Sequence, residues 1–102
     1  MALVAAVSAL LVAAALASSA AVHGVSAGDN FFDPTKVKIG QGEKVEWTND
    51  GSNDHTVKFK GAKNKVIGPG ETTSKRFKDV GSFSYHCTIH ADMDGKVVVK
   101  DV

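Results

Sequence analysis

The charged part of the chain is built of short runs in which apolar and polar residues alternate, a pattern typical of strands with one buried face. The expected strands cover residues 36–39, 44–48, 56–60, 72–77, 82–87 and 96–99. Turn-forming stretches such as Gly68-Pro69-Gly70 separate them. Because no helical stripe interrupts these short strands, the sequence predicts an all-β fold, a small antiparallel sandwich or barrel.

The beginning of the chain differs from the rest. Its first 22 residues carry no charged side chain and consist mostly of Ala, Val and Leu. An apolar stretch followed by small residues is typical of a secretory signal peptide, so we expect residues 1–27 to be a leader and residues 28–102 to be the domain. Cleavage is expected at Ala20-Ala21 or at Ala27-Gly28. The alternative is a retained membrane anchor, because about 20 apolar residues can span a bilayer. Both interpretations place the charged domain outside the cytoplasmic membrane, in the periplasm or an equivalent space.

The charge of the chain limits the kinds of molecule that it is expected to bind. The 12 basic and 11 acidic residues give a net charge of +1, which does not favour a nucleic-acid partner. Basic residues are concentrated in residues 58–78, where Glu71 is the only acidic residue. Such a run is ordinarily a solvated face. The alternative is a surface that steers an acidic partner.

The candidate chemistry lies near the end of the chain, where Cys87, His90 and Met93 fall within seven residues, and His55 lies upstream. Two histidines, one cysteine and one methionine form the ligand set of a blue-copper electron-transfer site, with a weak axial methionine. The chain has one cysteine, so an intramolecular disulfide is excluded. A lone thiol in an oxidising compartment is a liability unless something protects or uses it, and a metal site does both.

Strand phase places two of these residues on the apolar side of their strands. Side chains two residues apart share a face, so His55 is in phase with Phe59, and Cys87 is in phase with Tyr85. A sandwich can bring two such strand ends together at one pole. The same alternation points His86 outward.

These residues carry a family resemblance. The pattern His55 with Cys87-x-x-His90-x-x-Met93 on strand-like sequence resembles the cupredoxins, small blue copper proteins, and its spacing is that of the amicyanin and plastocyanin-like members. The resemblance covers residues 30–102 and includes Phe32-x-Pro34, Val45-x-Trp47-x-Asn49 and Tyr85-x-Cys87. It implies a Greek-key β-sandwich that binds one copper ion, cycling between Cu(I) and Cu(II), through His55, Cys87, His90 and Met93.

The resemblance also implies a function and its partners. The chain would be a monomeric electron carrier and not an enzyme, with redox partner proteins docking near His90, Ile89 and Ala91. It would touch a membrane only if the apolar segment were retained. In the family, the residue after the first histidine ligand donates its backbone N–H to the thiolate, and that position is Thr56 here. One departure is Ile89, because amicyanin-like loops carry proline there; another is the short interval between His55 and Cys87.

Other functions remain open on the sequence alone. Copper handling, as a chaperone or storage protein, would be favoured by clustered methionines, but Met1 and Met93 are the only two. A structural zinc site would normally be completed by Cys or His rather than by Met. His23 is expected to be incidental, and Trp47 is expected to pack in the core.

Overall fold

The computed structural model describes residues 21–101, which form an all-β domain. The strands are β1 (Val22–Gly28), β2 (Phe31–Asp33), β3 (Lys36–Gly40), β4 (Lys44–Asn49), β5 (His55–Phe59), β6 (Lys65–Ile67), β7 (Thr72–Arg76), β8 (Gly81–His86) and β9 (Asp94–Lys100). Within residues 21–101, no helix has the length and apolarity needed to cross a membrane.

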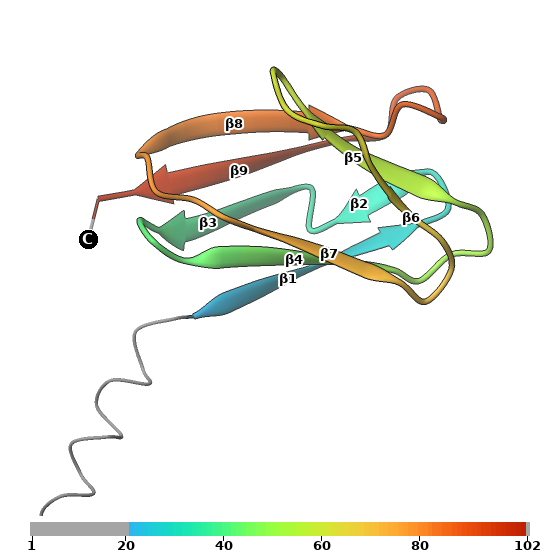
Figure 1. Cartoon of the computed structure of the whole chain (residues 1–102), viewed down its shortest axis with the longest axis horizontal. Coiled ribbons are helices and arrows are strands. Elements are labelled where there is room, and N and C mark those ends of the chain that lie inside the picture. The colour runs from blue at the N-terminus through green and yellow to red at the C-terminus, as the bar shows by residue number, and fades with distance from the viewer. Residues whose placement is uncertain (1–20, 102) are drawn as a thin grey trace, which may run out of the picture.

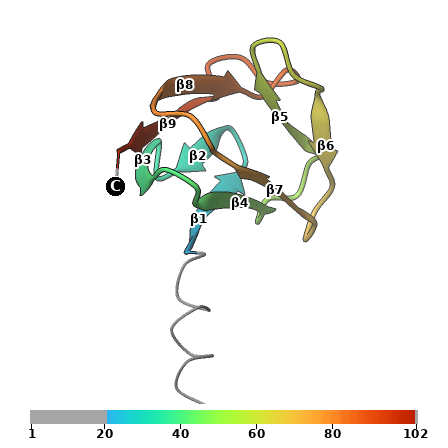
Figure 2. The same cartoon turned by 60° about the vertical axis from the view of Figure 1, so that its left-hand side comes forward.

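Two sheets pack face to face, which confirms the expected β-sandwich (Figures 1 and 2). One sheet has the strand order β2-β1-β4-β7, and the other has the order β3-β9-β8-β5-β6. The expectation of purely antiparallel sheets needs correction, because β1 pairs with β4 and β3 pairs with β9 in parallel. Parallel neighbours require a crossover. Here the crossover runs through the opposite sheet, since β3 lies there while β1 and β4 are neighbours in the first.

The core follows from the alternation seen in the sequence. On β4, Val45 and Trp47 are buried and Glu46 is exposed between them. The Trp47 ring meets the rings of Tyr85 and Phe59 edge-on, with centroids 5.3 and 5.8 Å apart, an arrangement that aromatic quadrupoles favour. The expected core role of Trp47 is therefore confirmed, and aromatic side chains from both sheets fix the distance between them.

The domain includes a strand that precedes the boundary expected at residues 27 and 28. β1 pairs with β4 from Val22 opposite Lys44 to Ala27 opposite Asn49, and Val25 and Ala27 are buried. β1 is thus an inner strand of its sheet, and a domain beginning at Gly28 would lack it. Residues 1–20, which make up most of the expected leader, lie outside the described part of the chain.

Candidate metal centre

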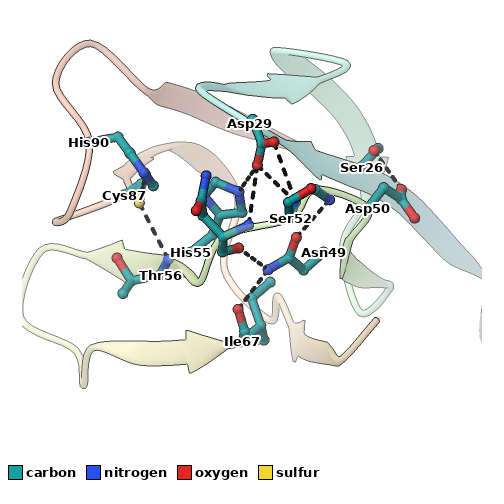
Figure 3. Close-up of polar contacts among 12 residues, drawn as sticks. Ser26, Asp29, Asn49, Asp50, Ser52, His55, Thr56, Ile67, Cys87 and His90 are labelled. Atoms are coloured by element: carbon teal, nitrogen blue, oxygen red, sulfur yellow. Dashed lines mark hydrogen bonds and ion pairs between the residues drawn. The ribbon is translucent and has the colours of Figure 1, made fainter. Parts of the chain in front are cut away.

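Three of the predicted ligands meet at one end of the sandwich. One ligand atom from each of His55, Cys87 and His90 lies within 4.8 Å of the others. Cys87 Sγ lies 3.4 Å from His90 Nδ1, and the two imidazole rings have centroids 4.9 Å apart. The pairing of β5 with β8 explains this meeting, because His55 opens β5 and Cys87 directly follows β8. Strand phase therefore brought His55 and Cys87 to the same place, and Figure 3 shows them beside His90.

The fourth predicted ligand lies on a closed loop. The backbone N–H of Cys87 donates to the carbonyl of Met93 at 2.9 Å, which ties the two ends of the segment together. Asp92 adopts a left-handed backbone conformation, with φ of 58°, and turns the chain back toward β9. Met93 is 1% exposed and belongs to the same buried cluster as Cys87. The backbone thereby brings the thioether residue into the interior beside the thiol residue.

Thr56 joins the two halves of the site, as expected from the family pattern. Its backbone N–H donates to Cys87 Sγ at 3.4 Å. Its hydroxyl oxygen accepts from the N–H of Thr88 at 2.7 Å and lies 3.0 Å from the Thr88 hydroxyl. These contacts hold the first turn of the cysteine loop against β5.

The surroundings of Cys87 favour the thiolate. Burial raises the pKa of the thiol, but the backbone N–H groups of Thr56 and Ile89 and the His90 ring lower it to about 6, from an ordinary value of 9.0. Hydrogen bonds to the charged form stabilise that form. The thiolate is the metal-binding and nucleophilic state of cysteine, so the site is prepared to bind a soft cation.

One ring nitrogen of His55 indicates whether these three side chains could hold a metal ion. Nε2 of His55 lies 3.3 Å from Asp29 Oδ1, whereas Nδ1 is buried without a hydrogen-bond partner among the described residues. Figure 3 shows Nδ1 on the side of Cys87 and His90. A buried polar atom without a partner is costly, and a metal ion between these three side chains would satisfy it. Two imidazoles with a thiolate suit copper, so the residues fit that metal.

The remaining residues singled out from the sequence lie away from this cluster. His86 is exposed on the outer face of its sheet, as expected. His23 lies on β1 and its Nε2 is 2.8 Å from Glu43 Oε1.

The contacts of two residues beside the site were not predicted from the sequence, although one of them, Asn49, belongs to the family pattern. Asp29 follows β1 and contacts a ring 26 residues away, a relation that spacing alone cannot show. Asn49 is buried, and its amide group donates to the carbonyls of Asn53 and Ile67 and its oxygen accepts from Gly51, each at 2.8 Å. The sequence carries a signal for this role: Asn49 is polar but in phase with the apolar Val45 and Trp47. A buried amide must satisfy its hydrogen bonds, so such a residue is expected to hold neighbouring backbone groups.

The pKa of Asp29 also reflects this loop. Partial burial raises the pKa of its carboxyl, but the N–H groups of Ser52 and Asn53 and the His55 ring together hold it below its usual value of 3.8. The side chain is therefore a carboxylate at neutral pH, and the hydrogen on the His55–Asp29 contact belongs to His55.

Comparison with known proteins agrees with this geometry. The family model for a cupredoxin-like domain matches residues 1–99. The chain belongs to the cupredoxin-like family. This cupredoxin is 40% identical over 76 residues to amicyanin-alpha of Methylorubrum extorquens, a match that covers 68% of this chain and 64% of that protein. It is 30% identical over 92 residues to plastocyanin of Scenedesmus fuscus, covering 76% of this chain and 94% of that protein.

Solved structures give the same relation. The reduced Cu(I) form of an amicyanin mutant at pH 4 superposes with a TM-score of 0.73 at 28% identity, covering 78% of this chain and 82% of that one. The match to amicyanin-alpha spans less than two thirds of that relative.

Proposed function

We propose that this cupredoxin is a blue copper protein that carries single electrons between redox partners and is not an enzyme. Its ligands are His55, Cys87, His90 and Met93. The observation that carries the proposal is the convergence of two imidazoles and a low-pKa thiol around the unpartnered Nδ1 of His55. When bound, copper supplies the one-electron couple between Cu(I) and Cu(II).

The chain's own residues keep this site rigid. His55 is held by β5, and the segment from Cys87 to Met93 is closed by its own backbone hydrogen bond. The N–H of Thr56 offsets part of the thiolate charge and, as a donor to a ligand, tunes both metal affinity and potential. A site whose ligands are fixed by two strands and a short loop moves little between oxidation states, which favours fast electron transfer.

Copper handling is the alternative, and burial argues against it. Delivery of a metal by ligand exchange requires ligands that another protein can reach. His55, Cys87 and Met93 are 0%, 2% and 1% exposed, so a partner could approach only through His90. That arrangement suits passage of an electron better than passage of an ion.

Docking of redox partners is proposed around His90, the half-buried member of the ligand set. It is flanked by Ile89, which is 54% exposed, and by the exposed Ala91, so the approach to His90 is apolar. The outer face of the neighbouring five-stranded sheet is mostly basic, with Asp94 as an acidic residue beside Lys96. The lysines on this face occupy positions that alternate with inward-facing residues: Lys36, Lys38, Lys58, Lys60, Lys96 and Lys100.

The basic face indicates the charge of the redox partner. Lys36 stands directly opposite Lys96 in the β3–β9 pairing, and like charges directly opposite destabilise a sheet. A chain with a net charge of +1 that groups its lysines in this way favours an acidic partner, and complementary charge raises the rate of encounter. The protein acts as a monomer in the space outside the cytoplasmic membrane, after removal of its leader.

A visible spectrum tests the proposal. Copper(II) added to the purified metal-free domain should give an intense blue thiolate-to-copper band, and a reductant should bleach it. The zinc-loaded protein is the matched control and should stay colourless, because zinc has no redox chemistry and a filled d shell. A pale copper(II) spectrum without the intense band would refute a blue copper site.

A further inference from the structure

We propose that Asp29 is the positioning residue of the site: its carboxylate holds the His55 ring by Nε2–H, directs the Nδ1 lone pair at Cys87 and His90, and adds negative charge behind that ligand. The orientation is a property of the metal-free chain. The effects on copper affinity and potential rest on the proposed function.

The contacts assign the proton on His55. A carboxylate accepts hydrogen bonds and has none to donate, so the 3.3 Å contact between Asp29 Oδ1 and His55 Nε2 requires a hydrogen on Nε2. With that hydrogen on Nε2, the lone pair available to a metal lies on Nδ1, the atom that is buried without a partner among the described residues. The ring is 0% exposed, so Asp29, and not solvent, is the partner of Nε2 in the folded chain.

The carboxylate is itself fixed by the loop that leads into β5. Oδ1 accepts from the N–H of Ser52 at 3.1 Å and of Asn53 at 3.4 Å, and Oδ2 lies 3.3 Å from the Ser52 N–H. Asn30 follows in the left-handed region, with φ of 77°, and turns the chain from β1 into β2. Asp29 thus lies in the turn of the β1–β2 hairpin, and its side chain connects the first sheet to the loop that leads into β5 (Figure 3).

Gly51 provides the space for this bridge. A Cβ at position 51 would collide with the carboxylate oxygen and carbon of Asp29. The backbone of Gly51 does not lie in the left-handed region, unlike that of Gly42, Gly61 or Gly70, so its conformation alone does not require glycine. The absent side chain is therefore explained by the approach of Asp29.

Such a carboxylate behind a histidine ligand does more than hold a loop. A partner on the second ring nitrogen fixes tautomer and orientation and raises the basicity of the ligand, and loss of such partners costs roughly 10- to 100-fold in metal affinity. Negative charge near the site also stabilises the oxidised metal, so its removal should raise the reduction potential. A residue that only capped the Ser52 and Asn53 amides would produce neither effect.

The test compares Asp29→Ala, Asp29→Asn and Gly51→Ala with Asp50→Asn as the matched control. Asp50 carries the same charge and joins the same loop to β1, through a 2.6 Å hydrogen bond from Ser26. Nitrogen NMR of the metal-free protein should show His55 as the Nε2–H tautomer in the wild type and in Asp50→Asn. Asp29→Ala and Gly51→Ala should populate the Nδ1–H form. Asp29→Asn should keep the tautomer, because its amide oxygen still accepts.

Competition titration with copper(II) gives the second measurement. Asp29→Ala should bind about 10- to 100-fold more weakly and Asp50→Asn within about twofold, as for an ordinary surface change. Asp29→Asn should fall between them and raise the potential. Because Gly51→Ala acts through Asp29, the double variant Asp29→Ala/Gly51→Ala should be no weaker than Asp29→Ala alone.

Two outcomes overturn the inference. One is an unchanged tautomer in Asp29→Ala together with copper affinity within twofold of wild type in both Asp29 variants, which would leave Asp29 as a loop cap. The other is full additivity of the Asp29 and Gly51 changes. If the copper-loaded wild type lacks the blue band but the tautomer changes in Asp29→Ala, the proposed function is refuted and the positioning role is kept. If Asp29→Ala does not fold, the copper affinity and reduction potential of Asp29→Asn, which retains the acceptor oxygen, test the inference.

Discussion

Gly95 stands directly opposite Tyr85 in the β8–β9 pairing, and the Tyr85 ring occupies the space that a Cβ at position 95 would take. This contact leaves no room for a side chain at position 95. The segment from Cys87 to Met93 ends two residues earlier, where the Met93 carbonyl accepts from the Cys87 N–H. The strand that follows the metal-binding loop therefore packs its backbone directly against the Tyr85 ring.

Gly95→Ala should destabilise the domain by about 1–3 kcal/mol, the usual cost of forcing extra volume into a packed site. Urea unfolding of the metal-free protein measures it. Gly24→Ala is the matched control, because Gly24 is also a strand glycine but a Cβ there meets nothing within 4 Å. Equal stabilities of the two variants would show that Tyr85 yields without cost.

The ligand assignment predicts different outcomes for the two sulfur residues. Cys87→Ser should abolish the intense visible band, because no thiolate remains to donate charge to copper(II). Met93→Leu should keep the blue colour and raise the reduction potential, because the axial ligand tunes the potential. Spectra and voltammetry of both copper-loaded variants measure this, and an intense blue Cys87→Ser protein would exclude the assignment.

The low pKa of Cys87 predicts a pH dependence for the metal-free protein. The thiol titrates at about 6 in the folded state against an ordinary 9.0, so between these values the unfolded chain binds more protons. Stability should therefore rise with pH across this window: the contribution is complete above 9.0 and is lost as pH falls through about 6. Denaturant unfolding under anaerobic conditions measures it.

Cys87→Ser is the control for this pH dependence. It retains His55 and His90, so the difference between the two proteins isolates the thiol. If the variant shows the same rise in stability with pH, Cys87 is not the group responsible.

Much of the site was predictable because its determinants are local. The spacing of Cys87, His90 and Met93 lies within one loop, and alternation alone placed His55 and Cys87 on inward faces. Trp47 and His86 followed from the same rule. These features need only a strand and its phase, which the sequence carries directly.

The features that escaped the sequence are non-local or too short. β1 has the sequence VHGVSAG, whose small residues merge with the apolar leader and hide its alternation. β2 and β6 have three residues each, too few to show a period. The parallel pairs and the contact of Asp29 with His55 join segments distant in the chain, and no spacing rule reports them.

The position of β1 predicts where the mature chain begins. Cleavage at Ala27-Gly28 would remove the strand that pairs with β4, so processing is expected at Ala20-Ala21, where small residues suit a signal peptidase. Intact-mass measurement of the exported protein identifies the first residue. A chain starting at Gly28 would contradict this prediction, and a full-length protein extracted only by detergent would show a retained anchor.

The basic face predicts the salt dependence of electron transfer with an anionic partner. Lys60 and Lys96 are exposed and line one depression together with His86 and Asp94. Lys58 is tied by hydrogen bonds to the carbonyls of Phe59 and Ala62. Lys60→Glu and Lys96→Glu therefore change the surface charge without disturbing β5. Both should slow oxidation of the reduced protein by hexacyanoferrate(III) at low salt, because the anion is no longer attracted to this face.

Lys78→Glu separates local steering from net charge. Lys78 is exposed on the connection between β7 and β8, and its reversal changes the total charge by the same amount as either face variant. Stopped-flow rates across a range of ionic strength should fall more for Lys60→Glu and Lys96→Glu than for Lys78→Glu. The rates should converge at high salt, where charges farther apart than a Debye length are screened. Equal slowing by all three variants would mean that only net charge matters and that the face does not direct a partner.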